Sequence, residues 1–196
     1  MTILLAILGY LFGSIPFGLI LVRAAGLGDI RNIGSGNIGT SNVLRTGRKD
    51  LALATLILDA AKGAIAFALA YWLFKQGYTT ALIAGFFAVL GHNFSIFLKF
   101  KGGKGVATSL GLYAVAAPII TIVTLIIWLI VALITRISSL AAMTALLVTP
   151  AVALLYGNKP LALISFLLWG LCMFRHKDNI IRILNGTENK IGGIKD

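Results

Sequence analysis

Residues 119–134 read IITIVTLIIWLIVALI, an apolar run without a charged side chain. Such a run approaches the ~20 residues that an α-helix needs to cross the hydrocarbon core of a bilayer. Similar runs recur at residues 3–22, 51–74, 79–98, 106–117, 137–156 and 161–174. None alternates polar and apolar residues as a strand would, and lipid accommodates only helices or closed barrels. The runs therefore predict an all-α, polytopic integral membrane bundle.

The composition excludes an ordinary soluble domain. Of the 196 residues, 59% are hydrophobic and 12% are charged, whereas soluble domains carry about 25% charged residues. The gaps between the runs are short outside residues 23–50 and the tail from residue 175 onward, so we expect one integral membrane domain over residues 1–196. The single cysteine, Cys172, excludes an internal disulfide bond.

Positive charge is concentrated in three polar segments. The chain holds 17 lysines and arginines against 6 acidic residues, a net charge of +11. Basic proteins often bind nucleic acid, but no basic helix or soluble module carries the charge here, and no nucleic-acid partner is expected. The segments comprise Arg23, Arg31, Arg45, Arg48 and Lys49; Lys99, Lys101 and Lys104; and Arg175, Lys177, Arg182, Lys190 and Lys195.

The positive-inside rule places all three segments on the cytoplasmic side. The N-terminus then lies outside, and the C-terminus lies in the cytoplasm. An even number of crossings must separate Lys104 from Arg175, and four result if residues 106–117 form a short span that ends at Pro118. We therefore expect seven transmembrane helices. Five helices are the alternative, with two of the last four runs merged or re-entrant.

The first polar segment, residues 29–45, reads DIRNIGSGNIGTSNVLR. Its glycines let the backbone approach a ligand closely and take positive φ, so that successive amides form an anion-binding nest. Its arginine guanidinium suits phosphate. A flexible polar connector is the alternative, but the excess of donors over carboxylates favours an anion site. The candidate residues are Gly34, Ser35, Gly36, Asn37, Gly39, Thr40, Ser41, Asn42 and Arg45.

The second polar segment, residues 99–108, reads KFKGGKGVAT and resembles a phosphate loop. The Walker A spacing fails, because Leu98 stands where the first glycine is required. Gly102, Gly103 and Lys104 nevertheless precede a predicted helix, whose N-terminus attracts anions. His92, about two helical turns earlier, is more typical of a hydrogen-bonded packing residue than of a base.

The third polar segment, residues 175–190, holds a histidine among basic residues. Attraction to anionic lipid accounts for its arginines and lysines. It does not account for His176, Asn179 and Glu188. We expect His176 and Asn179, three residues apart, to share one face of a short interfacial helix.

Two charged residues interrupt the second apolar run. Asp59 and Lys62 are three residues apart and therefore lie on one helical face. Burying either alone costs roughly 2.5–3.5 kcal/mol, so we expect an ion pair that faces the bundle. A structural role is favoured over a catalytic one, although a charged residue inside the membrane is by default also a functional candidate. Close helix packing is indicated in the first run by Gly9, Gly13, Pro16 and Gly18.

The inventory of side chains favours anion binding over metal chemistry. Two histidines, one cysteine and six carboxylates show no zinc-like spacing, and neither a metal nor another cofactor is expected. Ser35 is not in a nucleophile elbow, because Ile33 occupies the position of its first glycine. Amides, hydroxyls, arginine and lysine suit a reaction in which the substrates bring the reactive groups and the protein supplies position and charge.

Several of these residues fall into longer motifs. They are Gly13-Ser14-Ile15-Pro16-Phe17-Gly18, the Gly-Ser-Gly-Asn-x-Gly-x-x-Asn-x-x-Arg run from Gly34 to Arg45, Asp59-Ala60-Ala61-Lys62-Gly63, Gly91-His92, Phe100 to Thr108, and His176 with Asn179 and Glu188. Together they resemble the motifs of one bacterial membrane family, the acyl-phosphate:glycerol-3-phosphate acyltransferases of phospholipid synthesis. The resemblance runs nearly end to end.

The resemblance implies a reaction. Members of this family transfer a fatty acyl group from acyl phosphate to the 1-hydroxyl of sn-glycerol 3-phosphate, giving lysophosphatidic acid and inorganic phosphate. They use neither acyl-CoA nor acyl carrier protein directly. The sequence agrees, because neither His92 nor His176 begins the His-x4-Asp pair of soluble-type acyltransferases. The implied setting is the cell inner membrane, with a site that faces the cytoplasm and an acyl-phosphate-producing enzyme as functional partner.

The resemblance also implies roles for single residues. Arg45 and Lys104 are expected to bind substrate phosphate or developing phosphate charge. Ser35, His176 and Asn179 are expected to fix the glycerol portion, and either His176 or substrate phosphate acts as the base. The amides of Gly102 and Gly103, with Thr40 or Ser41, are expected to cradle the acyl phosphate. The further substrate-binding residues are Gly34, Asn37, Asn42 and Glu188.

A transporter or channel for phosphate or another anion is the competing class, because it would share basic residues and glycine loops. Against it, the donors gather on one side of the membrane and no inverted repeat is evident. A non-catalytic lipid-binding scaffold is a third class. It would not need Ser35, Asn179 and His176 together with Arg45.

Overall fold

The structure, a computed structural model, describes residues 1–192, and its regular secondary structure is helical. No strand occurs in this part of the chain, which confirms the predicted all-α class. Lys195, assigned above to the third basic segment, lies outside the described residues. The helices form two compact units, Met1–Ala116 and a second unit that begins at Ala117. The single domain expected for residues 1–196 stays a prediction.

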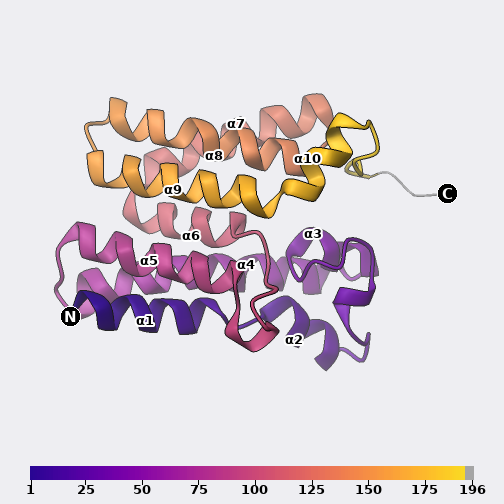
Figure 1. Cartoon of the computed structure of the whole chain (residues 1–196), viewed down its shortest axis with the longest axis horizontal. Coiled ribbons are helices and arrows are strands. Elements are labelled where there is room, and N and C mark those ends of the chain that lie inside the picture. Colours follow the sequence, from indigo (N-terminus) through magenta and orange to yellow (C-terminus); the bar gives the residue numbers. More distant parts are fainter. Residues whose placement is uncertain (193–196) are drawn as a thin grey trace. The chain divides into compact units, whose positions relative to one another are not determined.

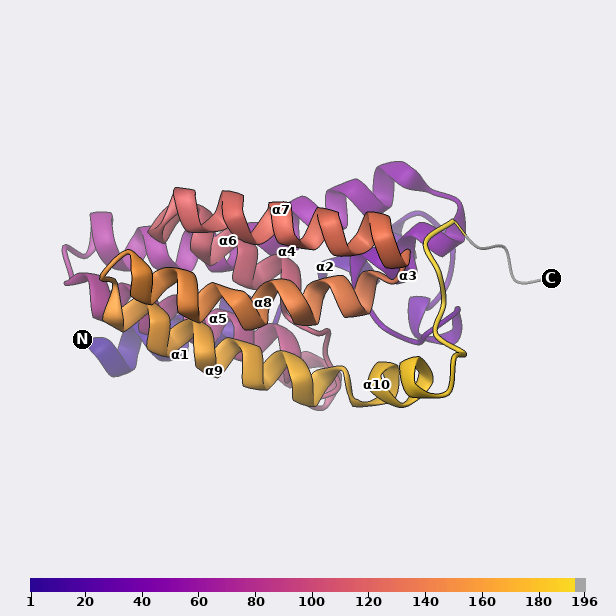
Figure 2. The same cartoon turned by 90° about the horizontal axis from the view of Figure 1, so that it is seen from above.

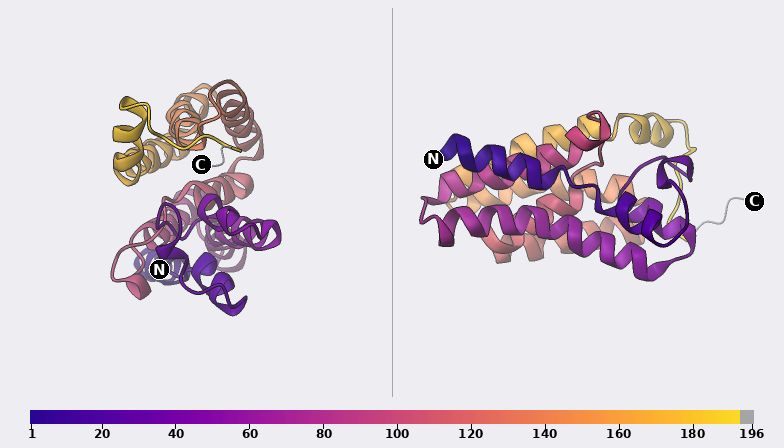
Figure 3. Two further views of the ribbon diagram at one scale, coloured as in Figure 1. Left: turned by 90° about the vertical axis from the view of Figure 1, so that its right-hand side faces the viewer. Right: turned by 90° about the horizontal axis from the view of Figure 1, so that it is seen from below.

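The first unit is arranged around α4 and α5. Its helices are α1 (Thr2–Gly13), α2 (Phe17–Ala24), α3 (Thr40–Val43), α4 (Lys49–Ala68), α5 (Tyr78–Asn93) and α6 (Val106–Ala116). A π-helical turn, Leu69–Leu73, continues α4. α1 packs along α5, and α4 packs along α5 and α6 (Figure 1). α2 and α3 lie at the end of this unit away from the N-terminus (Figure 3).

Glycines bring α1 and α5 into backbone contact. A Cβ atom on Gly9 would lie 2.4 Å from the carbonyl oxygen of Ala84, and one on Gly13 would lie 2.1 Å from that of Ala88. Any side chain at these positions would force the helices apart, as at small-residue interfaces in other membrane bundles. The close packing predicted for both glycines is confirmed.

The first apolar run is two helices rather than one. α1 ends and α2 begins on either side of Ser14–Pro16, because Pro16 has no amide hydrogen to continue a helix. Gly18 lies close both to α4, where a Cβ atom on it would lie 3.1 Å from Cγ2 of Thr55, and to the first polar segment. A Cβ atom there would lie 2.0 Å from the carbonyl oxygen of Ile38, so Gly18 accommodates the first polar segment.

A small hydrophobic core anchors the first polar segment. Three short turns, Ile30–Asn32, Leu44–Thr46 and α3, interrupt the loop between α2 and α4. Leu98 also enters this core, and it ends the 3-10 turn Ile96–Leu98 directly before the second polar segment. The first two polar segments therefore share one apolar base. The buried members are Leu19, Val22, Ile30, Ile38, Val43, Ala52 and Leu98.

The second unit is a row of antiparallel helices with a short terminal helix. It contains α7 (Pro118–Thr135), α8 (Ser138–Leu155), α9 (Lys159–Arg175) and α10 (Lys177–Leu184). α8 packs between α7 and α9, and α10 follows the end of α9 (Figure 2). The buried hydroxyls of Thr124 and Thr149 are 2.9 Å apart and join α7 to α8.

Five stretches are long and apolar enough to cross a bilayer: Thr2–Ala24, Lys49–Leu73, Tyr78–Leu98, Pro118–Thr135 and Ser138–Leu155. The break predicted at Pro118 is confirmed as the start of α7. α6 has 11 residues and is about 16 Å long, roughly half the thickness of the hydrocarbon core. α9 has 17 residues. The count of seven crossings and the orientation of the termini stay predictions.

Candidate functional site

Asn42 organises the first polar segment from within. Its side-chain Nδ2 donates to the carbonyl oxygens of Ile30, Ile33 and Asn37 at 3.0, 2.9 and 2.8 Å. Its Oδ1 accepts the backbone N–H of Ser35 at 3.0 Å. The side chain is buried, and both its amide nitrogen and its oxygen already bond to backbone groups of the loop. Asn42 was expected to contact substrate, whereas its position in the fold is that of a loop-forming residue.

Gly34 makes room for Arg45. Gly34 has a φ of +54°, and a Cβ atom on it would lie 2.8 Å from Cδ and 2.9 Å from Nη1 of Arg45. The guanidinium therefore lies directly against the glycine turn. Gly36 also has positive φ, +70°. Gly39 does not, because it precedes α3 with a φ of −81°.

Arg45 differs from its neighbouring arginines, because no carboxylate of the described residues pairs with it. Arg23 and Arg31 both bind Asp29 at 2.6 Å, and Arg48 binds Asp50 at 2.6 Å. The Arg31 guanidinium holds the pKa of Asp29 well below its usual range. Within residues 1–192, Arg45 makes no ion pair and its side chain is exposed. Its charge is therefore available to an external anion.

Hydroxyl donors surround this arginine in the sequence. The side chains of Ser35 and Ser41 are exposed and make no hydrogen bond to any described residue. The Thr40 hydroxyl is buried and likewise has no partner in the described part of the chain. Asn37 accepts the Gly39 N–H at 2.8 Å through Oδ1, which leaves its Nδ2 as a donor. The first segment thus divides into residues that shape the loop and residues that still offer hydrogen bonds.

The glycine loop of the second segment folds back onto the end of α5. The N–H of Gly102 donates to the Asn93 carbonyl at 3.1 Å, and the N–H of Gly103 donates to the His92 carbonyl at 2.9 Å. Their expected role as a phosphate cradle would require both hydrogen bonds to open. Lys104 follows directly and is half-buried. The first-turn amides of α6, which have no carbonyl partner within that helix, are further backbone donors at the end of this loop.

Glu188 holds the third segment together. Its Oε1 accepts hydrogen bonds from Ser139 at 2.8 Å and from Asn179 at 2.5 Å, and its Oε2 accepts from Arg182 at 2.7 Å. Burial raises the pKa of Glu188, but the hydrogen bonds from Asn179, Arg182 and Ser139 outweigh it and keep the pKa below its usual range. Both carboxylate oxygens are engaged, so Glu188 positions Asn179 in this fold.

His176 and Asn179 are both buried, and His176 lies directly before α10 rather than within the same helix as Asn179. His176 ends α9 and precedes α10. Its Nδ1 lies 2.9 Å from the Cys172 carbonyl oxygen and 3.2 Å from the Cys172 sulfur. If Nδ1 donates to that carbonyl, Nε2 is the nitrogen that carries the lone pair. The orienting group is therefore a backbone carbonyl.

Sequence reasoning gave no role to Ser139, and the structure joins it to this group. Arg136 and Ile137 form the turn between α7 and α8, and Ser138 and Ser139 begin α8. Ser139 binds Glu188, and Arg136 donates to the Ile191 carbonyl at 3.1 Å. The signal was present, because Arg136-Ile137-Ser138-Ser139 is a polar cluster where two apolar runs meet. Its partner was not evident, because the two lie 49 positions apart.

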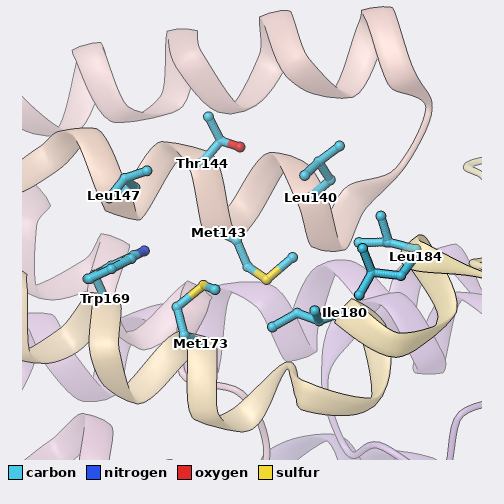
Figure 4. A pocket seen from close by; sticks show the side chains of 9 residues that line it. Leu140, Met143, Thr144, Leu147, Trp169, Met173, Ile180 and Leu184 are labelled. Atoms are coloured by element: carbon cyan, nitrogen blue, oxygen red, sulfur yellow. The ribbon is translucent and has the colours of Figure 1, made fainter.

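An apolar pocket opens beside α10. It has a volume of about 260 Å³, and its lining side chains converge from α8, α9 and α10 (Figure 4). Met173 and Ile180 stand close in sequence to His176 and Asn179. The lining residues are Leu140, Met143, Thr144, Leu147, Trp169, Met173, Ile180, Ile183 and Leu184.

The chain matches one family model from residue 3 to residue 186, that of "Glycerol-3-phosphate acyltransferase". It belongs to this family. The protein is therefore an acyltransferase of the class that serves phospholipid biosynthesis, which confirms the relationship indicated by the sequence motifs. Among residues 1–192 no three or more His, Cys, Asp or Glu side chains gather as metal ligands would.

Relatives with the same name are similar over nearly their whole length. Glycerol-3-phosphate acyltransferase of Rhizobium etli (strain CIAT 652) is 52% identical over 95% of this chain and 90% of its own. That of Paramagnetospirillum magneticum is 55% identical over 95% of this chain and 92% of its own. The similarity to these acyltransferases therefore covers nearly all of this chain and about nine-tenths of each relative.

The fold is that of a solved family member. The crystal structure of PlsY (YgiH), an integral membrane glycerol 3-phosphate acyltransferase, in its glycerol 3-phosphate form, matches with a TM-score of 0.91 and 35% identity over 97% of this chain and 96% of that chain. Its lysophosphatidic acid form matches with a TM-score of 0.89 and 34% identity over 97% and 95%. This acyltransferase is thus an integral membrane protein.

The carboxylate of Glu188 predicts a pH-dependent contribution to stability. Its pKa in the folded protein lies below the unfolded value of about 4.3. The contribution is therefore complete above the unfolded pKa and is lost as the pH falls through the folded pKa. We expect the difference in Tm between wild type and Glu188→Gln to be largest near pH 7 and to shrink as the pH is lowered below about 4. A pH-independent difference would contradict the assignment.

Proposed function

We propose that this protein transfers a fatty acyl group from acyl phosphate to the 1-hydroxyl of sn-glycerol 3-phosphate, releasing lysophosphatidic acid and inorganic phosphate. The observation that carries the proposal is Arg45, an exposed guanidinium without a carboxylate among residues 1–192, placed against the Gly34 turn. Family membership supports the same conclusion. An unpaired arginine among hydroxyl donors suits a phosphate monoester.

Arg45 and Lys104 bind phosphate in this proposal. Ser35, His176 and Asn179 fix the glycerol portion, and Thr40 or Ser41 bonds the acyl phosphate. The first-turn amides of α6 take the place proposed above for Gly102 and Gly103, because those two amides already donate to the end of α5. Asn42 and Glu188 act through other residues: Asn42 shapes the loop of Ser35, and Glu188 holds Asn179.

The chemistry needs little from the protein beyond position and charge. The 1-hydroxyl oxygen attacks the acyl carbon, and the bond from that carbon to the phosphate oxygen breaks. The hydroxyl proton passes to His176 or directly to the departing phosphate. Cationic groups stabilise the charge that develops on the carbonyl oxygen and on the phosphate.

The acyl chain of the donor requires an apolar surface, and the pocket beside α10 has this character (Figure 4). Its walls carry Met173 and Ile180, which stand close in sequence to His176 and Asn179. The pocket is therefore our candidate for the acyl-chain site.

We further propose seven transmembrane helices, with α6 and α9 as the two short ones, an external N-terminus and a cytoplasmic C-terminus. The three basic segments then face the cytoplasm at the inner membrane. A cytoplasmic site would receive acyl phosphate from an acyl-phosphate-producing enzyme, the functional partner that this reaction requires.

The reaction itself is tested with purified protein in detergent or vesicles. Given palmitoyl phosphate and glycerol 3-phosphate, it should release inorganic phosphate and form lysophosphatidic acid in equal amounts. Palmitoyl-CoA should not replace palmitoyl phosphate. Phosphate movement across vesicles without formation of lysophosphatidic acid would instead support an anion transporter.

The phosphate-binding roles are tested by truncation. Arg45→Ala and Lys104→Ala should each lower kcat/KM by about 100-fold or more, because each removes a charge-assisted contact to phosphate. Arg48→Ala and Lys101→Ala are matched controls, since both remove an exposed cation close in sequence, and they should retain activity within about threefold. Full activity in Arg45→Ala or Lys104→Ala would refute the assignment.

The proposed orientation is tested by cysteine labelling in intact membranes. Cysteines introduced at Asn37, Lys101 and Lys177, none of which is buried, should react with a membrane-impermeant reagent only when the cytoplasmic face is open. Cys172 is buried and provides the background. Reaction of the three positions from opposite faces would exclude this topology.

A further inference from the structure

Three ionisable side chains meet inside the first unit. The Lys62 Nζ lies 2.7 Å from Asp59 Oδ1 and 3.2 Å from His92 Nδ1. The three residues are 0%, 2% and 4% exposed, respectively, and the Phe17 ring lies 5.0 Å from the same Nζ. A charged pair in a membrane bundle needs only its two partners to avoid an isolated charge. The third residue therefore requires its own explanation.

The geometry selects one tautomer of His92. An ammonium group only donates hydrogen bonds, so the His92 Nδ1 that faces Lys62 must accept and Nε2 must carry the proton. The alternative, Nδ1–H donating to Asp59, has the longer separation of 3.5 Å. A doubly protonated ring would place a second positive charge beside the ammonium. Lys62 thus fixes both the tautomer and the orientation of the imidazole.

His92 is also the residue on which the glycine loop rests. Its carbonyl oxygen accepts the N–H of Gly103 at 2.9 Å. A Cβ atom on Gly103 would lie 2.0 Å from Nε2 of the same histidine, so the imidazole fills the space that a side chain would need. The next residue along the chain is Lys104.

The same turn of α4 also holds the other flank of the loop. A Cβ atom on Gly63 would lie 2.0 Å from the Thr108 carbonyl oxygen, and one on Gly111 would lie 1.8 Å from the Ala60 carbonyl oxygen. α6, which begins directly after the loop, is therefore in backbone contact with α4. Residues 59–63 therefore contact both helices that flank the glycine loop: α5 through His92, and α6 through Thr108 and Gly111.

We propose that Asp59 and Lys62 are positioning residues of the acyltransferase site. They hold His92 in its Nε2–H tautomer, His92 supports Gly103, and this support sets the position of Lys104. The proposal rests on the phosphate-binding role proposed above for Lys104. It assigns to a buried ion pair within the bundle a function beyond charge neutralisation.

The tautomer is measured in the unmodified protein. The chain has two histidines, so ¹⁵N NMR of protein labelled at histidine, with His92→Gln to assign the signals, reports the protonated nitrogen of His92. At neutral pH we expect Nε2–H. Nδ1–H in the wild-type protein would overturn the proposal, because it would make Asp59 the partner of the ring.

The consequence for the loop is measured in Asp59→Leu/Lys62→Met. Replacing a buried ion pair by apolar residues of similar volume is often neutral for folding, so we expect a Tm within about 5 °C of wild type. The KM for glycerol 3-phosphate should nevertheless rise about tenfold, which corresponds to a displaced phosphate contact. Wild-type kinetics in this folded variant would overturn the proposal.

A second readout does not depend on activity. A nitroxide attached to a cysteine at position 101 should become more mobile in Asp59→Leu/Lys62→Met, and an unchanged spectrum would count against the proposal. Arg48→Gln/Asp50→Asn is the matched control, because it removes an exposed ion pair from the start of the same helix. If wild type shows no acyl transfer, the proposed function fails while the tautomer and the loop mobility still decide the positioning role. If the double variant does not fold, the wild-type tautomer decides.

Discussion

Lipid offers no hydrogen bonds, so every polar group that this chain carries toward the bilayer must find its partner within the protein. The response differs between the segments. Asn42 satisfies three loop carbonyls with one side chain, Glu188 collects three donors, and Lys62 is shared between Asp59 and His92. These side chains replace the water that would solvate a loop of a soluble protein. Arg45 contrasts with these three side chains, because it makes no ion pair within residues 1–192.

Glycines also stabilise the bundle, because they let helices approach each other closely. Where Gly13 meets Ala88 and Gly111 meets Ala60, helices touch through their backbones, and dispersion contacts take the place of a hydrophobic force that is absent between helices in lipid. Such contacts leave no room for adjustment. The loops that end at these helices inherit defined positions, which is what a site built from donors on separate elements requires.

Much of the fold was accessible from the sequence, because apolar run length and Pro118 act locally. The membrane class, the family and the Asp59–Lys62 pair were all predicted, and the pair is found at 2.7 Å. The interruption of the first run at Ser14–Pro16 was not predicted, since hydropathy alone does not distinguish one helix from two. Nor were the partners of Gly18, His92 and Ser139. Each of these contacts joins residues far apart in the chain, and periodicity within one helix carries no information about them.

The arginine that lies against Gly34 has a consequence for selectivity. A guanidinium without a carboxylate attracts any phosphate, and inorganic phosphate is itself a product of the proposed reaction. The charge therefore favours entry of an anion without distinguishing substrate from product. In the proposed site, discrimination must come from neutral groups such as the Ser35 hydroxyl, which is proposed above to bond the glycerol portion that free phosphate lacks. On this view the enzyme works against competition from its own product, and phosphate-rich surroundings slow it.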